Sequence, residues 1–303
     1  ERCTVRVNRR LRWVALPLAI ASAVTLAACS PTTANGFLPG FDEGGGQATN
    51  HTSMIAGLWT TSWIVVLAVG VITWALMGWA AIAYRRRKGQ SGLPVQLRYN
   101  MPIEMFFTIT PVILVLGFFA FTARDQAILE TQYENPDVCV TAIGKQWAWD
   151  FQYNGNNCDD PQDPVWTMGV QAQTDAEGNI TNDIPELVLP VNKKVTLQLE
   201  SRDVIHSFWI VDFLYKKDMY PGRENYWSFT PTKEGTFVGK CAELCGQYHS
   251  MMLFNVKVVS ESEYENYIAS LKAKGQTGDI DDAFDRQQNA PGTGAPAAEG
   301  AHN

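Results

Sequence analysis

Two long apolar runs divide the chain into a membrane-type first part and a more polar second part. Residues 55–84 carry no charge, and residues 103–123 hold one ionisable side chain, Glu104. Each run is long enough for a helix that crosses a bilayer, which needs about 20 apolar residues. The loop between them, residues 85–100, is rich in Arg and lacks acids, which places it in the cytoplasm. The pattern predicts a transmembrane helix hairpin over residues 53–124, with everything after it outside the cytoplasm.

The first 28 residues have the layout of a signal peptide, because an arginine-rich start precedes an apolar segment. That segment ends in Leu26-Ala-Ala-Cys29, which resembles a bacterial lipobox. We therefore expect lipidation of Cys29 at the mature N-terminus. An ordinary signal peptide with an incidental cysteine is the alternative. Residues 29–52 are rich in Gly, Thr and Asn, which predicts a flexible external linker.

Beyond residue 124, short runs of β-branched and aromatic residues alternate with Pro, Gly, Asn and Asp. This spacing is typical of an all-β sandwich or barrel, which we place at residues 125–270. The expected strands cover residues 139–143, 146–153, 186–189, 194–199, 206–211, 226–229, 236–239 and 253–259. After Ser270 the composition changes to Gly, Ala, Pro and Gln, so residues 271–303 are expected to form a disordered tail.

The predicted external part is acidic. Residues 124–270 contain 22 Asp and Glu against 11 Lys and Arg. Such a surface would steer a basic partner towards it, although the same charge would also keep an exported domain soluble. No nucleic acid is expected as a partner.

Cysteines 139 and 158 flank a candidate hairpin in the predicted external domain. An oxidising compartment allows a disulfide between Cys139 and Cys158. Pairing cannot be deduced from sequence alone, so this disulfide is one of two open interpretations.

The segment Lys240–Met252, "KCAELCGQYHSMM", concentrates thiols, an imidazole and thioethers. Its Cys, His and Met positions are spaced four, four and three apart, which would also fit one face of a core helix. Gly246 interrupts that pattern, and residues 253–259 alternate like a strand. We therefore expect a ligand-bearing loop that leads into a strand.

The chemistry of these side chains indicates a metal. Zinc would accept Cys241, Cys245 and the imidazoles of His206 and His249, and is the strongest inorganic alternative. The soft thioether of Met252 beside thiolates and imidazoles favours copper. A second cysteine, with one imidazole available for each metal, suggests two coppers bridged by two thiolates.

The pattern Cys-x-Glu-x-Cys-x3-His-x2-Met resembles that of subunit II of the haem–copper cytochrome c oxidases, and the resemblance covers nearly all of residues 53–270. It implies a two-helix transmembrane hairpin followed by an all-β cupredoxin-like sandwich that holds a binuclear copper centre, CuA. It also implies a subunit of a proton-translocating oxidoreductase in a bacterial cell membrane. Electrons would pass from a c-type cytochrome through CuA to haem in subunit I, where oxygen is reduced to water.

The resemblance also implies roles for individual ligands. Cys241 and Cys245 would be the bridging thiolates, and His206 and His249 the terminal imidazoles. The two remaining ligands, one for each copper, would be Met252 and the backbone carbonyl of Glu243. The carboxylate of Glu243 would bind a Mg²⁺ shared with subunit I, which suits a hard oxygen ligand.

Two positions outside the ligand motif match the family as well. Trp147 falls where electrons enter from the cytochrome, although Trp147, Trp149, Phe151 and Tyr153 would all lie in the core if they shared one strand face. Glu104 matches a position at the entrance of a proton channel in subunit I. A glutamate in the first turn of a helix is also favourable simply through the helix dipole.

The partners implied by the resemblance are oxidase subunits I and III, membrane lipid and a c-type cytochrome. Many relatives have an aromatic residue where this chain has Ala148, which leaves open a membrane-bound donor in a supercomplex. No Cys-x-x-Cys-His motif occurs, so we expect no haem in this chain. Quinol oxidases lack these copper ligands, and nitrous oxide reductases carry a propeller domain. A copper-containing nitric oxide reductase subunit and a membrane-anchored copper carrier remain as alternatives.

Overall fold

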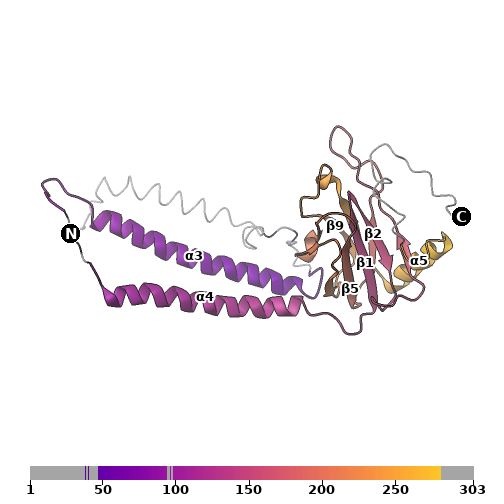
Figure 1. The fold of residues 1–303 in the computed structure, drawn as a ribbon, viewed down its shortest axis with the longest axis horizontal. Helices are drawn as coiled ribbons and strands as arrows, with labels where there is room; N and C mark the ends of the chain where they lie inside the picture. Colours follow the sequence, from indigo (N-terminus) through magenta and orange to yellow (C-terminus); the bar gives the residue numbers. More distant parts are fainter. Residues whose placement is uncertain (1–37, 39, 41–46, 94–95, 97, 281–303) are drawn as a thin grey trace, which may run out of the picture.

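The chain forms a long helical hairpin followed by a β-sandwich (Figure 1). The computed structural model describes residues 38, 40, 47–93, 96 and 98–280. The predicted signal peptide and Cys29 lie outside these residues, as do positions 281–303 of the predicted tail.

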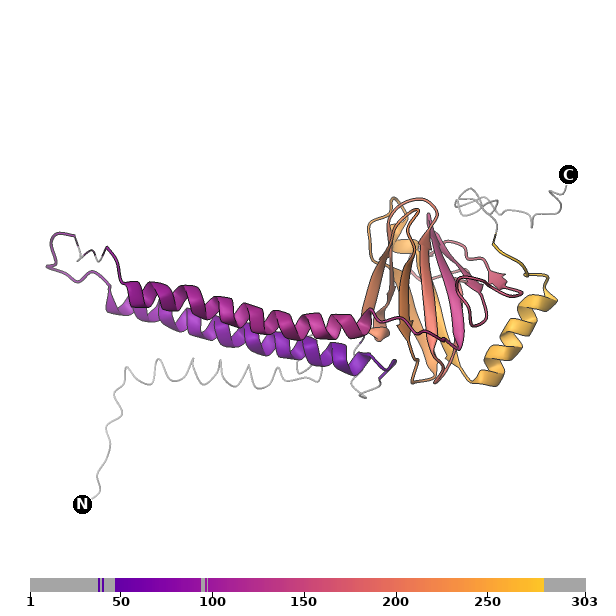
Figure 2. The same ribbon diagram turned by 60° about the horizontal axis from the view of Figure 1, so that its bottom comes forward.

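The hairpin consists of α3 (Thr52–Ala83) and α4 (Met101–Leu129), which lie side by side and extend away from the sandwich (Figure 2). Both helices are long and apolar enough to cross a membrane. Their large apolar side chains are exposed over most of their length, as expected for helices whose partner is lipid or another membrane protein. The two-helix hairpin predicted from the sequence is confirmed.

The start of α4 shows why its first turn is helical. The side chain of Asn100 caps the helix and accepts a hydrogen bond from the amide of Ile103 at 3.5 Å. In return, Glu104 Oε1 accepts from the backbone amide of Asn100 at 2.9 Å. These bonds satisfy amide groups that have no partner inside the helix.

The sandwich consists of two five-stranded sheets, in which most neighbouring strands are antiparallel. The first sheet has the order β3 (Val165–Thr167), β2 (Ala148–Tyr153), β1 (Val138–Lys145), β5 (Val195–Ser201) and β8 (Asn225–Phe229). The second has the order β4 (Glu186–Pro190), β10 (Leu253–Val259), β9 (Gly235–Cys241), β6 (His206–Ile210) and β7 (Tyr215–Met219). The predicted all-β sandwich is therefore confirmed.

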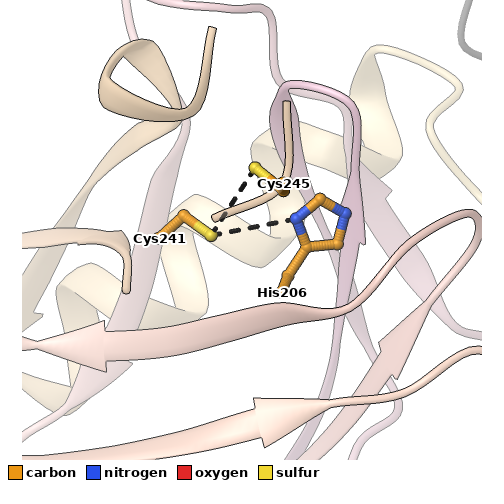
Figure 3. Close-up of side chains that lie close together, drawn as sticks. All are labelled: His206, Cys241 and Cys245. Atoms are coloured by element: carbon orange, nitrogen blue, oxygen red, sulfur yellow. Dashed lines mark hydrogen bonds between the residues drawn. The ribbon is translucent and has the colours of Figure 1, made fainter. Parts of the chain in front are cut away.

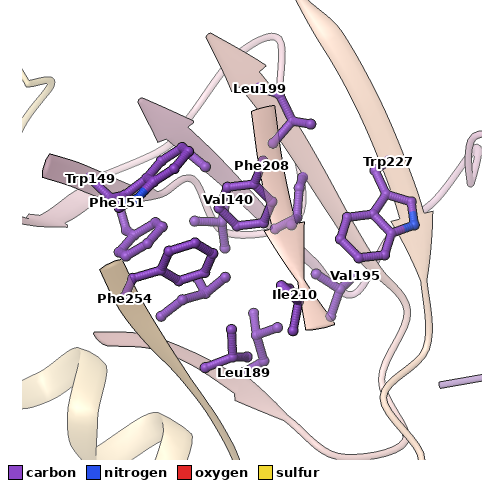
Figure 4. Packing of buried hydrophobic residues seen from close by; sticks show 14 of the residues in the cluster. Val140, Trp149, Phe151, Leu189, Val195, Leu199, Phe208, Ile210, Trp227 and Phe254 are labelled. Carbon is purple, nitrogen blue, oxygen red and sulfur yellow. The ribbon is translucent and has the colours of Figure 1, made fainter. Parts of the chain in front are cut away.

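Aromatic side chains from both sheets form the centre of the core (Figure 4). Phe208 stacks on Phe254 with 4.7 Å between ring centroids. Trp149 meets both rings edge-on, at 5.2 and 5.1 Å. Because these rings are fully buried, they fix how the two sheets face each other at the end where the candidate ligands lie.

The structure adds elements that the sequence analysis lacks. β7 is an edge strand with two lysines, so it has no apolar alternation by which to recognise it. α5 (Glu261–Ala273) begins with a capping box between Ser260 and Glu263. The prediction that the disordered tail begins at residue 271 is wrong, because α5 continues past it and buries Leu271 against the sandwich.

Cysteines 139 and 158 form a disulfide, with their Cα atoms 5.4 Å apart. Cys139 is fully buried in β1, and Cys158 follows the turn after β2. The bridge therefore fastens that turn to the first sheet, as the sequence allowed.

Both ends of the hairpin that face the sandwich are bonded to it. Before α3, Asn50 exchanges two hydrogen bonds with Thr230, at 3.0 and 2.8 Å. After α4, the carboxylate of Glu130 accepts a hydrogen bond from the hydroxyl of Tyr215 at 2.5 Å and pairs with Lys217. The membrane helices are thus joined to the β-domain at two separate points.

Candidate metal centre

The candidate ligands lie together at one end of the second sheet, where β6 begins and β9 ends. β6 and β9 pair antiparallel with Phe208 opposite Cys241, which brings His206 at the start of β6 next to the end of β9. After Cys241 the chain forms a loop that contains the short η2 helix (His249–Met251) and then enters β10. The predicted loop that leads into a strand is confirmed, and the core-helix interpretation is wrong.

Three ligand atoms form a compact, buried group: His206 Nδ1, Cys241 Sγ and Cys245 Sγ, which all lie within 4.8 Å of one another. Cys241 Sγ lies 3.9 Å from Cys245 Sγ and 3.8 Å from His206 Nδ1 (Figure 3). Gly144 leaves room for the imidazole, since a Cβ atom there would lie 3.0 Å from His206 Cδ2.

The remaining predicted ligands approach the same group from the loop. His249 Nδ1 lies 3.5 Å from Cys245 Sγ, and Met252 Sδ lies 3.8 Å from that sulfur. The backbone oxygen of Glu243 lies 3.2 Å from Cys241 Sγ, while its side chain is exposed. Each thiol therefore faces its own imidazole, and one weak donor stands beside each sulfur.

The pKa values of the two thiols are shifted in opposite directions. Contact with the Cys245 thiol, helped by His206 and nearby backbone groups, lowers the pKa of Cys241 to about 4 despite its burial. The resulting thiolate, together with burial, raises the pKa of Cys245. The pair therefore readily holds one negative charge, and a bound cation would displace the second proton.

Asp203 orients the first imidazole and is a site residue that the sequence analysis missed. Its buried Oδ1 lies 2.8 Å from His206 Nε2, and its Oδ2 accepts from the amide of Gln146 at 2.7 Å. Burial alone would lower the pKa of His206, but Asp203 and Cys241 together outweigh it and raise that pKa. The carboxylate thereby holds the proton on Nε2 and leaves Nδ1 free to bind a metal. The only sequence signal was an acid three residues before a histidine.

We expect Asp203→Asn to weaken copper binding by about 10- to 100-fold, because carboxylates that hold a ligating imidazole typically contribute that much to metal affinity. Titration of the metal-free external domain with Cu²⁺, followed by its absorption spectrum, measures the change. Asp183→Asn is the control, since it removes the same charge from an exposed loop residue. Equal affinities for the two variants would contradict the role of Asp203.

Trp147 lies in the turn between β1 and β2 and is only half buried, whereas Trp149, Phe151 and Tyr153 are core residues. Its indole Nε1 donates to the carbonyl of Cys245 at 3.3 Å. The structure thus separates Trp147 from the other three aromatic residues and places it against the ligand loop.

Glu104 is remote from the ligand group. It lies in the first turn of α4, and α4 leads into the sandwich at its other end, roughly 40 Å away at 1.5 Å per residue. Its bond to the Asn100 amide gives it a role at the helix start. The structure does not bring it together with the other candidate residues.

A solved structure of the periplasmic domain of subunit II of cytochrome oxidase from Bradyrhizobium japonicum is 34% identical to this chain. The match covers 46% of this chain and 96% of that domain, with a TM-score of 0.39.

Residues 138–259 match the family model described as cytochrome c oxidase subunit II, periplasmic domain. A probable cytochrome c oxidase subunit 2 of Streptomyces avermitilis is 44% identical over 253 residues, which cover 76% of this chain and 79% of that protein. Cytochrome c oxidase subunit 2 of Mycobacterium tuberculosis is 32% identical over 302 residues, which cover 86% of this chain and 82% of that protein.

The fold and the site define a membrane protein with an extracytoplasmic β-sandwich and a buried His–Cys group suited to a metal. The relatives make the assignment specific. The chain belongs to the cytochrome c oxidase subunit II family, and it is therefore part of an oxidoreductase complex.

Proposed function

We propose that this chain is the electron-accepting subunit of a respiratory cytochrome c oxidase, with a binuclear CuA centre in the β9–β10 loop. The observation that carries the proposal is the pairing of donors. Cys241 faces His206, Cys245 faces His249, and the two sulfurs lie 3.9 Å apart. A single tetrahedral zinc would not require a thioether or a peptide oxygen as well.

The donor chemistry fits copper. Thiolates, imidazoles and a thioether suit a soft metal, and the compact ligand group contains no carboxylate. Cys241 and Cys245 would bridge the metals, His206 and His249 would terminate them, and Met252 would be a weak ligand. When bound, the copper pair supplies one-electron exchange without large movement of its ligands. The protein contributes a ligand set in which the β6–β9 pairing fixes the backbone and the Asp203 bond fixes the His206 imidazole.

The backbone of Glu243 would complete the copper site, and its exposed carboxylate would be available for a Mg²⁺ shared with subunit I. A hard carboxylate oxygen suits that ion. Trp147 would receive the electron from the cytochrome, since its indole is partly exposed and bonded to the backbone of a ligand.

The partners proposed for the chain are subunits I and III, membrane lipid and a c-type cytochrome, either soluble or bound in a supercomplex. The acidic external part supports a basic donor, because it would attract one from solution.

We propose that electrons continue to haem in subunit I, that no haem is bound in this chain, and that Cys29 carries lipid. Intact-mass measurement of the mature protein tests the lipid assignment, which a protein retaining residues 1–28 would contradict.

Metal analysis and electron paramagnetic resonance of the purified subunit test the copper proposal. We expect two coppers per chain and a valence-delocalised signal. Zinc bound in preference, or a single copper without that signal, would contradict the site. The oxidase assignment is tested by measuring oxygen consumption by the assembled complex with a reduced c-type cytochrome. A complex that consumes no oxygen would contradict the assignment.

We expect Glu104→Gln to slow oxygen turnover while leaving copper reduction normal, if Glu104 guides protons towards subunit I. Stability should change by only about 0.3–1 kcal/mol, the usual contribution of a charge at a helix end. Oxygen-electrode rates and stopped-flow copper reduction, measured on the same sample, separate the two steps. Normal turnover would leave Glu104 with the capping role alone.

A further inference from the structure

A second aromatic ring holds Trp147 against the ligand loop. The ring of Tyr248 lies 5.0 Å from that of Trp147, with the two planes at 77°, which is an edge-to-face pair. The same indole also donates a hydrogen bond from Nε1 to the Cys245 carbonyl. The indole is therefore held by two residues of the same loop.

The loop is shaped to receive the indole. Gly246 has φ of +127°, a conformation that favours glycine, and a Cβ atom there would lie 3.1 Å from Trp147 Cζ2 and Nε1. Tyr248 directly precedes the ligand His249, and its carbonyl accepts from the amide of Met251 at 2.9 Å, which closes the short η2 helix. The backbone that positions the tyrosine is thus continuous with the backbone that positions a metal ligand.

The neighbouring residues on the Trp147 side cannot replace this contact. Ala148 is fully buried and offers only a methyl group, and Trp149 points into the core. Gln146 donates its side-chain amide to the Cys245 carbonyl at 2.7 Å, so it fastens the turn but not the indole plane. Among the aromatic pairs of the described residues, Tyr248 is the one ring that touches Trp147.

From this geometry we infer that Tyr248 is a positioning residue for electron uptake: it fixes the orientation of the Trp147 indole between an incoming donor and the ligand loop. The inference rests on the proposed function. It assigns the effect to the ring and not to the hydroxyl, because the contact is an aromatic one. Phenylalanine should therefore serve at this position, whereas alanine should not.

The experiment uses the assembled oxidase with its full-length subunit II and a reduced soluble c-type cytochrome, followed by stopped-flow absorption. We expect Tyr248→Ala to slow copper reduction by roughly three- to tenfold, the factor that corresponds to one edge-to-face aromatic pair. Copper content and the paramagnetic signal should stay at the unmutated level. Tyr248→Phe should restore the rate.

Tyr264→Ala is the matched control. It removes a tyrosine from another edge-to-face pair, with Tyr153 at 6.2 Å, on α5 away from the ligand loop. Its rate of electron uptake should equal that of the unmutated protein.

A double-variant cycle tests whether Tyr248 acts through Trp147. Trp147→Gln should slow uptake strongly with an intact copper signal, and adding Tyr248→Ala to it should cause no further loss, because coupled residues are not additive. Additive losses, an unchanged rate in Tyr248→Ala, or copper loss in that variant would each overturn the inference. A lack of cytochrome oxidation by the unmutated complex would instead reject the proposed function itself.

Discussion

Replacing Cys241 or Cys245 by serine is expected to abolish the binuclear copper signal completely and to leave one copper or none. Both sulfurs lie within 4.8 Å of His206 Nδ1 and 3.9 Å from each other, so each is placed to bridge two metals. A hard hydroxyl cannot replace a soft thiolate in that bridge. Metal analysis and electron paramagnetic resonance of the external domain, residues 124–303, measure the result.

Two other variants grade this prediction by ligand strength. Met252→Leu keeps a similar volume and removes only a weak donor, so both coppers should remain while the reduction potential changes. His206→Asn removes the imidazole from one metal, so its effect on copper binding should be weaker than that of the serine variants and stronger than that of Met252→Leu. Retention of two coppers and a delocalised signal in Cys241→Ser would refute the bridging role.

Lys145→Met is expected to destabilise the external domain by about 3–5 kcal/mol, which is the usual result of leaving a buried charge without its partner. Lys145 Nζ lies 2.8 Å from Asp150 Oδ1, and both side chains are almost completely buried. The pair closes the base of the β1–β2 turn that carries Trp147. Equilibrium unfolding in urea, followed by tryptophan fluorescence, measures the loss.

The pH dependence of this variant has a defined sign. Burial already raises the pKa of Asp150 above its ordinary value, despite the attraction of Lys145. Without the lysine the folded domain should hold the carboxyl proton more strongly still, so the destabilisation should be largest near neutral pH and shrink as the pH falls. Lys145→Met with Asp150→Leu is the control, and it should recover most of the stability. Full destabilisation at low pH would contradict the explanation.

Much of the candidate metal site could be predicted because its chemistry is local in sequence. Cys241, Cys245, His249 and Met252 lie within one short loop, and only His206 had to come from elsewhere. Its supporting residues could not be found in that way. Tyr248 meets Trp147 through a tertiary contact that its own sequence neighbours do not reveal. Asp203 lies only three residues before His206, but that spacing alone does not show that the carboxylate meets the imidazole.

The fold also combines predictable and unpredictable elements. Apolar alternation predicted most strands. It did not predict β7, because this strand lies at the sheet edge with one strand neighbour and its two lysines break the apolar alternation. The helix α5 did have a local signal, Ser260 followed three residues later by Glu263, which is the sequence form of a capping box.

The two attachments between the hairpin and the sandwich reduce the freedom of the β-domain, which carries the candidate metal site, above the bilayer. A single flexible tether would let the domain tumble, and its capture by a membrane-embedded partner would then cost rotational entropy at each assembly event. Here the rotational entropy is lost once, during folding. The contacts responsible are Asn50 with Thr230 on one side and Glu130 with Tyr215 and Lys217 on the other. The ligand loop is thereby preorganised at a set height and tilt before any partner binds.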